Sequence, residues 1–265
     1  MKKIIAIIMA AMMLLACMTS CTQPTEVEPK GDLQTVKDAG KLVVGVTVYE
    51  PMDYLDENNE WTGFDAELAQ MYAESLGVSC QLVIINWNNK VAELNSKQID
   101  LVWNGMTASD ELGEQIDFSV SYAKNAQVAV VKKGSTLTAD GVKDATIAVE
   151  NGSAGAAVAE KDIKASKINK VTAMVDALNE VKGGTSEVAI IDITMAQSVI
   201  GKGTYAELEI LEGASYGDEI FAVGLRKGSD LKESLDKFLK DKYAAGTLTE
   251  LAEEYKVGLN TDALK

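Results

Sequence analysis

Histidine is absent from this chain of 265 residues, and its single arginine is Arg226. The absence of histidine removes the usual general base, the commonest metal ligand and the Ser–His and Cys–His nucleophile pairs. The three cysteines, Cys17, Cys21 and Cys80, show neither CxxC nor zinc-type spacing. We therefore predict no metal site and no cofactor, and we expect binding of a ligand rather than catalysis.

Basic residues are few compared with acidic ones. Lys and Arg total 25, Asp and Glu total 40, and the formal net charge is −15. Phosphate binding relies on clustered Lys and Arg, so this acidic excess argues against a nucleic-acid partner. Hydrophobic residues at 47% and charged residues at 25% are typical of a soluble globular protein. A chain of this length can form one large domain or two modest ones.

The N-terminus predicts a targeting segment. Residues 1–16 contain two lysines and then an apolar run that is too short to span a bilayer but typical of a signal peptide. The run ends Leu-Leu-Ala-Cys, which resembles a bacterial lipobox and implies a lipid on Cys17; Cys21 is the alternative, and an ordinary cleaved signal is a third possibility. Residues 17–35 are polar around two prolines, and we expect a flexible tether there.

From near Val36 the pattern alternates between strands and helices. We predict strands over 41–46, 81–85 and 99–103, with helices after Asp65, as its N-cap, and from Trp87. This β-α-β-α-β order predicts a parallel sheet covered by helices. A second unit of the same kind follows from near Thr146, with strands over 147–149, 171–174, 188–191, 208–211 and 220–225. Two amphipathic helices are expected within 229–264.

Polar residues end the predicted strand over 99–103. Open α/β sheets bind small molecules beyond the C-terminal ends of their parallel strands. Glycine has no Cβ, so a ligand can approach its main chain closely. We therefore place part of a binding site on four consecutive residues, Asn104, Gly105, Met106 and Thr107.

Two motifs carry a family resemblance. Asp100, Gly105, Met106, Thr107, Glu111, Asp117-Phe118-Ser119 and Tyr122 match a pattern of the family 3 extracellular solute-binding proteins, the polar amino-acid-binding proteins of ABC importers. The string GFDAEL at 63–68 is similar to a second signature of that family. The resemblance covers roughly 36–258. It departs at Leu112, where relatives have an arginine that forms a salt bridge with the α-carboxylate of the ligand.

The resemblance implies an α/β protein with the two-lobed type II periplasmic-binding-protein fold, in which each lobe is a mainly parallel sheet flanked by helices. Lobe 1 would comprise 36–124 plus 222–265, and lobe 2 would comprise 125–221. The implied protein is a monomeric, extracytoplasmic, lipid-anchored substrate-binding lipoprotein. It would capture a small polar or zwitterionic solute and pass it to an ABC permease and ATPase in the cell membrane.

The resemblance also implies roles for individual residues. Asp192, at the end of a predicted lobe-2 strand, would bind the ammonium group, because carboxylates bind ammonium strongly once water is excluded. Ser153 and Ala154, at a predicted helix start, would face the carboxylate of the solute with Thr107. Tyr49 and Trp87 would form aromatic walls. The alternatives are that Asp192 only caps the next helix, that Ser109 and Ser153 act as caps, and that Trp87 is core.

Leu112 leaves the anchoring of a carboxylate open. Such a group could rely on Ser153, Thr107 and backbone donors or on Lys124, or the solute could lack a free α-carboxylate, as an amine, a blocked compound or a small peptide does. Two other functions stay open as well. One is a solute sensor of the same fold. The other is an enzyme, because this fold also hosts a cyclohexadienyl dehydratase.

Overall fold

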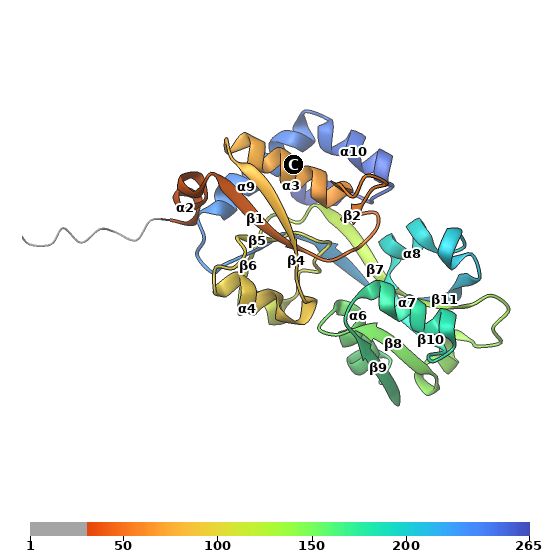
Figure 1. Ribbon diagram of the computed structural model, residues 1–265. Coiled ribbons are helices and arrows are strands. Elements are labelled where there is room, and N and C mark those ends of the chain that lie inside the picture. Colours follow the sequence, from red (N-terminus) through yellow and green to blue (C-terminus); the bar gives the residue numbers. More distant parts are fainter. Residues whose placement is uncertain (1–30) are drawn as a thin grey trace, which may run out of the picture. The chain divides into compact units, whose positions relative to one another are not determined.

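The computed structural model describes residues 31–265 (Figure 1). The predicted signal peptide, the lipidation sites Cys17 and Cys21 and most of the predicted tether lie outside the described residues. The described chain opens with helix α2 (Asp32–Ala39), so the last four residues of the predicted tether are helical. The helix is anchored by Arg226, whose Nε donates to Asp32 Oδ2 at 2.9 Å. This partner is distant in sequence, so the local pattern did not reveal the helix.

The first sheet has the strand order β4-β1-β5-β12-β6. β1 pairs in parallel with β4 and β5, whereas β12 is antiparallel to both β5 and β6, so four of the five strands run in one direction. The strands are β1 (Lys41–Val46), β4 (Ser79–Ile84), β5 (Leu101–Val102), β6 (Asp117–Phe118) and β12 (Gly224–Leu225). A separate two-stranded sheet contains β2 (Tyr54–Leu55) and β3 (Trp61–Thr62).

The second sheet has the order β11-β7-β10-β8-β9. β8 is parallel to β9 and β10, and β7 is antiparallel to β10 and β11, so here too four of five strands share a direction. The strands are β7 (Ala123–Lys132), β8 (Thr146–Glu150), β9 (Lys167–Val171), β10 (Val188–Asp192) and β11 (Leu208–Phe221). β11 is one long bulged strand, where the sequence predicted two strands, because β7 offers it a partner along most of its length.

Helices flank both sheets (Figure 1). The chain passes from β6 into β7 and returns from β11 to β12, and this double crossing separates two lobes. We call the part built on the first sheet the first lobe and the part built on the second sheet the second lobe. The α-helices of the first lobe are α2, α3 (Phe64–Ser75), α4 (Lys90–Asn95), α5 (Asp110–Gly113), α9 (Leu231–Ala244), α10 (Thr247–Tyr255) and α11 (Thr261–Leu264). Those of the second lobe are α6 (Ala154–Ala157), α7 (Met174–Gly183) and α8 (Ile193–Val199). The predicted two-lobed α/β fold is confirmed.

Asp65 has a different role from the predicted helix cap. Helix α3 is capped by Gly63, and its first turn contains Asp65, which is fully buried. The carboxylate of Asp65 accepts hydrogen bonds from the Gly105 backbone N–H at 2.6 Å and from the Tyr122 hydroxyl at 2.8 Å. Asp65 therefore fastens α3 to the polar end of β5. Burial raises the pKa of this carboxyl group to about 7.

Within residues 31–265, no helix combines the length and the apolar character that a membrane span requires.

Candidate functional site

A pair of carboxylates lies at the centre of the candidate site. Asp192 ends β10 and Glu219 lies on β11, and β7 runs between these two strands. Asn125 and Gln127 are two residues apart on β7, so their side chains project from the same face of the sheet. The Asn125 Nδ2 donates to Asp192 Oδ1 at 2.6 Å and to Glu219 Oε2 at 2.8 Å. Gln127 Nε2 donates to the same two oxygens at 2.5 and 2.9 Å. We call these four residues the carboxylate cluster.

The first lobe reaches the carboxylate cluster through Thr107. Its hydroxyl donates to Glu219 Oε2 at 3.0 Å, and its backbone forms an isolated bridge with Phe221 at the end of β11. Glu219 is thus the link between Thr107 of the first lobe and Asp192 of the second. Thr107 and Asp192, which were predicted to bind the solute from opposite lobes, are therefore joined by one continuous network of hydrogen bonds.

The surroundings of Asp192 disfavour the charged form of its carboxyl group. Burial, and secondly the charge of Glu219, raise the pKa of the Asp192 carboxyl group to about 7. The side chain makes no capping hydrogen bond to helix α8, which begins at the next residue, so the alternative of a plain helix cap is not met. The hydroxyl of the buried Tyr49 lies beside Asp192 without a hydrogen bond of normal geometry. A carboxylate in this setting is better stabilised by a cation than by the neutral amides alone.

A cavity of about 470 Å³ reaches the carboxylate cluster at Glu219. Both lobes contribute to its wall, and four predicted site residues line it together with Glu219: Thr107, Leu112, Ser153 and Ala154. The two lysines of the wall are already paired with carboxylates. Lys161 contacts Glu111 and Lys170 contacts Glu160, each at 2.7 Å.

Ser153 acts as a helix cap. Its Oγ accepts from the Ala156 backbone N–H at 3.1 Å, at the start of the four-residue helix α6. Ser109 does the same for Leu112 at 3.3 Å, as the capping alternative predicted. Neither hydroxyl therefore lacks a partner.

The family described as "Bacterial extracellular solute-binding proteins, family 3" matches residues 42–258. The chain belongs to this family. It is 29% identical over 231 residues to the L-cystine-binding protein TcyJ of Escherichia coli K12, covering 85% of this chain and 86% of that protein. It is 28% identical over 267 residues to the arginine-binding extracellular protein ArtP of Bacillus subtilis 168, covering 97% and 99%.

Solved structures agree with the fold of this family. The arginine-binding protein ArgBP of T. maritima, in a mutant form, superposes with a TM-score of 0.79 at 28% identity, covering 85% of this chain and 99% of that one. A shorter match, 27% over 117 residues and 44% of each chain, is to the cyclohexadienyl dehydratase of Pseudomonas aeruginosa. This solute-binding protein therefore has binding proteins among its full-length relatives and an enzyme among its partial ones.

Five predicted site residues of this solute-binding protein are buried and already contact other groups of the protein. The Asn104 side chain bonds with Thr47 and Asp53. The N–H of Gly105 is used by Asp65, and a Cβ at this glycine, where φ is +54°, would lie 2.7 Å from Tyr49 Cε1. The absence of a Cβ at Gly105 therefore leaves the space that the Tyr49 ring occupies. The remaining three are buried: Met106 and Trp87 in one hydrophobic cluster, and Tyr49 edge-on against Phe221.

Sequence reasoning overlooked several residues of the site. Glu219, Asn125 and Gln127 carried no local motif. It also overlooked Lys90, a buried lysine whose pKa is lowered to about 8 by its burial. Glu150 ends β8, and burial raises the pKa of its carboxyl group to about 8. The signal that could have revealed Lys90 was a lysine four residues before Leu94 on the helix face that turns inward.

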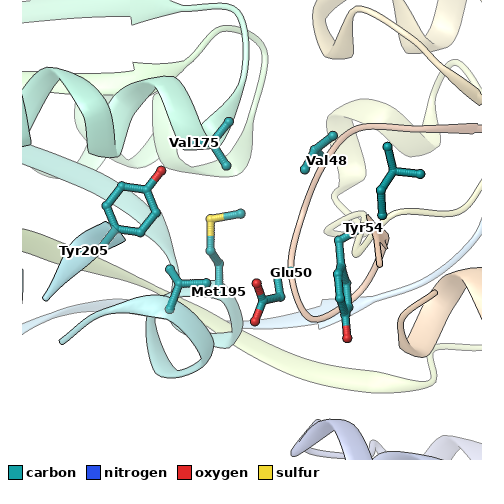
Figure 2. A pocket seen from close by; sticks show the side chains of 8 residues that line it. Val48, Glu50, Tyr54, Val175, Met195 and Tyr205 are labelled. Atoms are coloured by element: carbon teal, nitrogen blue, oxygen red, sulfur yellow. The ribbon is translucent and has the colours of Figure 1, made fainter. Parts of the chain in front are cut away.

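A second cavity, of about 250 Å³, also lies between residues of the two lobes. Figure 2 shows Val48, Glu50 and Tyr54 of the first lobe facing Val175, Met195 and Tyr205 of the second. Its wall is mainly apolar, with one carboxylate, Glu50, which accepts a hydrogen bond from the Ser198 hydroxyl at 2.9 Å. Among residues 31–265, no group of His, Cys, Asp and Glu side chains is arranged to hold a metal ion.

Proposed function

We propose that this protein captures a small, amino-acid-like solute bearing an ammonium group between its lobes and delivers it to an ABC importer. The observation that supports this most directly is the carboxylate cluster, in which Asp192 and Glu219 share two amide donors. Closure of two lobes around a solute excludes water and shifts an open–closed equilibrium toward the closed form. The family membership supports the same function.

The charge of the cluster favours a cation. Two carboxylates that share neutral amide donors retain negative charge, and burial makes that charge costly. An ammonium group has three N–H donors and a positive charge, so it would satisfy the oxygens and also neutralise them. We infer that the ammonium lies against Asp192 and Glu219, within reach of Thr107.

The opposite end of the solute has a weaker anchor. Leu112 offers no charge, and Lys161 and Lys170 in the cavity wall are paired with Glu111 and Glu160. A free carboxylate would depend on neutral donors alone, namely backbone N–H groups and the Ser153 hydroxyl, whose oxygen accepts the capping bond while its hydrogen can still donate. We therefore infer that the protein prefers amines and carboxylate-blocked solutes over plain amino acids of the same size.

A thermal-shift screen tests this function. The panel contains L-arginine, L-cystine, L-argininamide and simple diamines, since a ligand that binds only the folded state raises the melting temperature. Asp192→Asn should weaken binding of every ammonium solute by about 100-fold, a value typical of losing a buried charge-assisted contact. The matched control is Glu233→Gln, an exposed acid on α9, which should leave affinity unchanged. Equal affinity in wild type and Asp192→Asn would overturn the proposal.

We also infer that the protein works outside the cytoplasm as a monomer anchored by a lipid on Cys17. The lipobox-like end of the apolar N-terminal run supports this position over Cys21. Metabolic labelling with a palmitate analogue should mark the wild-type protein and Cys21→Ser but not Cys17→Ser. Labelling that is lost only in Cys21→Ser would move the anchor to that residue.

We propose no turnover of the solute, because the full-length relatives are named for binding. The partial match to a dehydratase makes a direct check worthwhile. Solutes that bind should be recovered unchanged by mass spectrometry after prolonged incubation with the protein. A product that forms in proportion to protein concentration would identify an enzyme instead.

A further inference from the structure

Lys90 is a buried lysine at the boundary between the lobes. It begins α4 in the first lobe and is 5% exposed, and it is the only lysine among residues 31–265 that is buried. Lysine is almost never fully buried unless its ammonium group has partners. The position of Lys90 therefore calls for a partner strong enough to offset the loss of hydration.

The strongest partner of Lys90 belongs to the second lobe. Its Nζ donates to the Gly152 carbonyl at 2.8 Å and to the Trp87 carbonyl at 3.2 Å. The same Nζ lies 4.7 Å from the centroid of the Trp87 ring, a cation–π contact. The carboxyl group of the buried Glu150, two residues before Gly152, adds an electrostatic attraction.

The backbone at Gly152 lets the two segments that carry this contact approach each other closely. Gly152 has φ +75°, and a Cβ there would lie 3.0 Å from Asn88 Oδ1 and 3.1 Å from Asn88 Cα. The loop over 151–153 thus lies directly against the segment over 87–90. That loop also sets the start of α6, because the Ser153 backbone N–H donates to Glu150 O and the Ser153 side chain caps Ala156.

Of the other polar contacts between the lobes, the one from Thr107 to Glu219 is part-buried and two more are exposed. Lys161 and Glu111 are 63% and 73% exposed, and surface ion pairs of this kind contribute little. The hydrogen bond between Ser198 and Glu50 is exposed as well. In contrast, the Lys90 ammonium is shielded from water, so its hydrogen bond with the Gly152 carbonyl is strong when made and is replaced by hydration when the lobes separate.

We propose that Lys90 is a positioning residue for solute capture. When the lobes close, Lys90 binds the Gly152–Ser153 loop of the second lobe to the first lobe. The contact holds the lining residues Ser153 and Ala154 opposite Thr107 and Leu112. Both groups of the contact belong to the protein, so it raises the closed fraction of the solute-free protein and slows the release of a bound solute. It rests on contacts within the fold and not on the identity of the solute.

The test is Lys90→Met, which keeps the length and apolar stem of the side chain and removes its charge. Hydrogen–deuterium exchange of the solute-free protein should become about tenfold faster over 151–157, as expected for the loss of one hydrogen bond from a charged donor. Exchange of β10 should stay unchanged, and the radius of gyration from small-angle X-ray scattering should increase. Lys90→Arg should retain the wild-type exchange, because it keeps a charged donor.

A control separates this role from general destabilisation. Lys240→Met, at an exposed position on α9, should leave exchange and radius of gyration unchanged. Lys90→Met leaves the Gly152 and Trp87 carbonyls without their donor, so exchange of β10 at the wild-type rate is what shows that the effect is local and not a general loss of stability. With L-arginine as the probe, its dissociation rate should rise about 10- to 100-fold while the association rate stays nearly constant. Wild-type exchange over 151–157 in Lys90→Met would overturn the proposal, even if no probe binds.

Discussion

Solute binding should depend on pH through Asp192. Because burial and Glu219 raise the pKa of this carboxyl group to about 7, Asp192 is half protonated at pH 7 in the solute-free protein. An ammonium group favours the ionised form and lowers that pKa. Binding should therefore be strong above pH 7 and should weaken as the pH falls below it.

The size of the effect follows from the ionised fraction. This fraction is about 90% at pH 8 and about 1% at pH 5, so an amine should bind about 100-fold more weakly at the lower pH. Binding at pH 7 should release about half a proton per solute, because protonated Asp192 must ionise. Calorimetry in buffers of different ionisation enthalpy measures both quantities.

Asp192→Asn provides the control, since its residual binding should vary little over this range. A wild-type protein that binds the tightest amine of the panel equally at pH 5 and pH 8 would refute this account of Asp192.

The same substitution, Asp192→Asn, should affect stability in the opposite direction. The raised pKa means that folding favours the protonated form, so stability is lost as the pH rises from about 4 to 7. Asp192→Asn should therefore stabilise the solute-free protein at pH 8, by at most about 4 kcal/mol, and have little effect at pH 4.

Three further predictions concern single residues. Leu112→Arg should strengthen binding of L-arginine relative to L-argininamide by about tenfold in calorimetry, because a guanidinium can pair with the carboxylate; an unchanged ratio would place that group elsewhere. Gly105→Ala should lower the free energy of unfolding by about 1–3 kcal/mol in urea, because the new Cβ meets the Tyr49 ring, whereas Gly77→Ala meets no neighbour and should cost less. Arg226→Met should cost about 3–5 kcal/mol by leaving Asp32 and two backbone carbonyls without their donor, and a loss under 1 kcal/mol would contradict this.

The sequence predicted the fold well because strand and helix periods are local. The strands over 41–46 and 188–191 were predicted within one residue of their observed ends, and the order of elements indicated two α/β units. Predictions were wrong where a distant partner decided the outcome. Asp65 reads locally as a helix cap, but its carboxylate is taken by Gly105 and Tyr122. Helix α2 was not predicted, and its first residues lie in the predicted tether, where Arg226 holds Asp32.

The candidate site was predictable in part for the same reason. Asp192 ends β10, and Thr107 lies in the segment that follows β5, and the sequence marks both places. Glu219 joins them only because β7 lies between β10 and β11 in a particular register, with Gln127 opposite both Asp192 and Tyr216. The register of antiparallel strands that are distant in the chain is not encoded by any one segment. A buried lysine such as Lys90 is equally hidden, since its partner Gly152 lies 62 residues away.

The shared amide donors of the carboxylate cluster have a consequence for redesign. Asn125 and Gln127 each donate to both acids, so replacing either acid by a side chain without an acceptor oxygen would leave amide hydrogens of both residues without a partner. The four residues behave as one unit of recognition. Converting this protein into a sensor for a neutral analyte would therefore require coordinated replacement of the whole quartet, chosen from combinatorial libraries and not residue by residue.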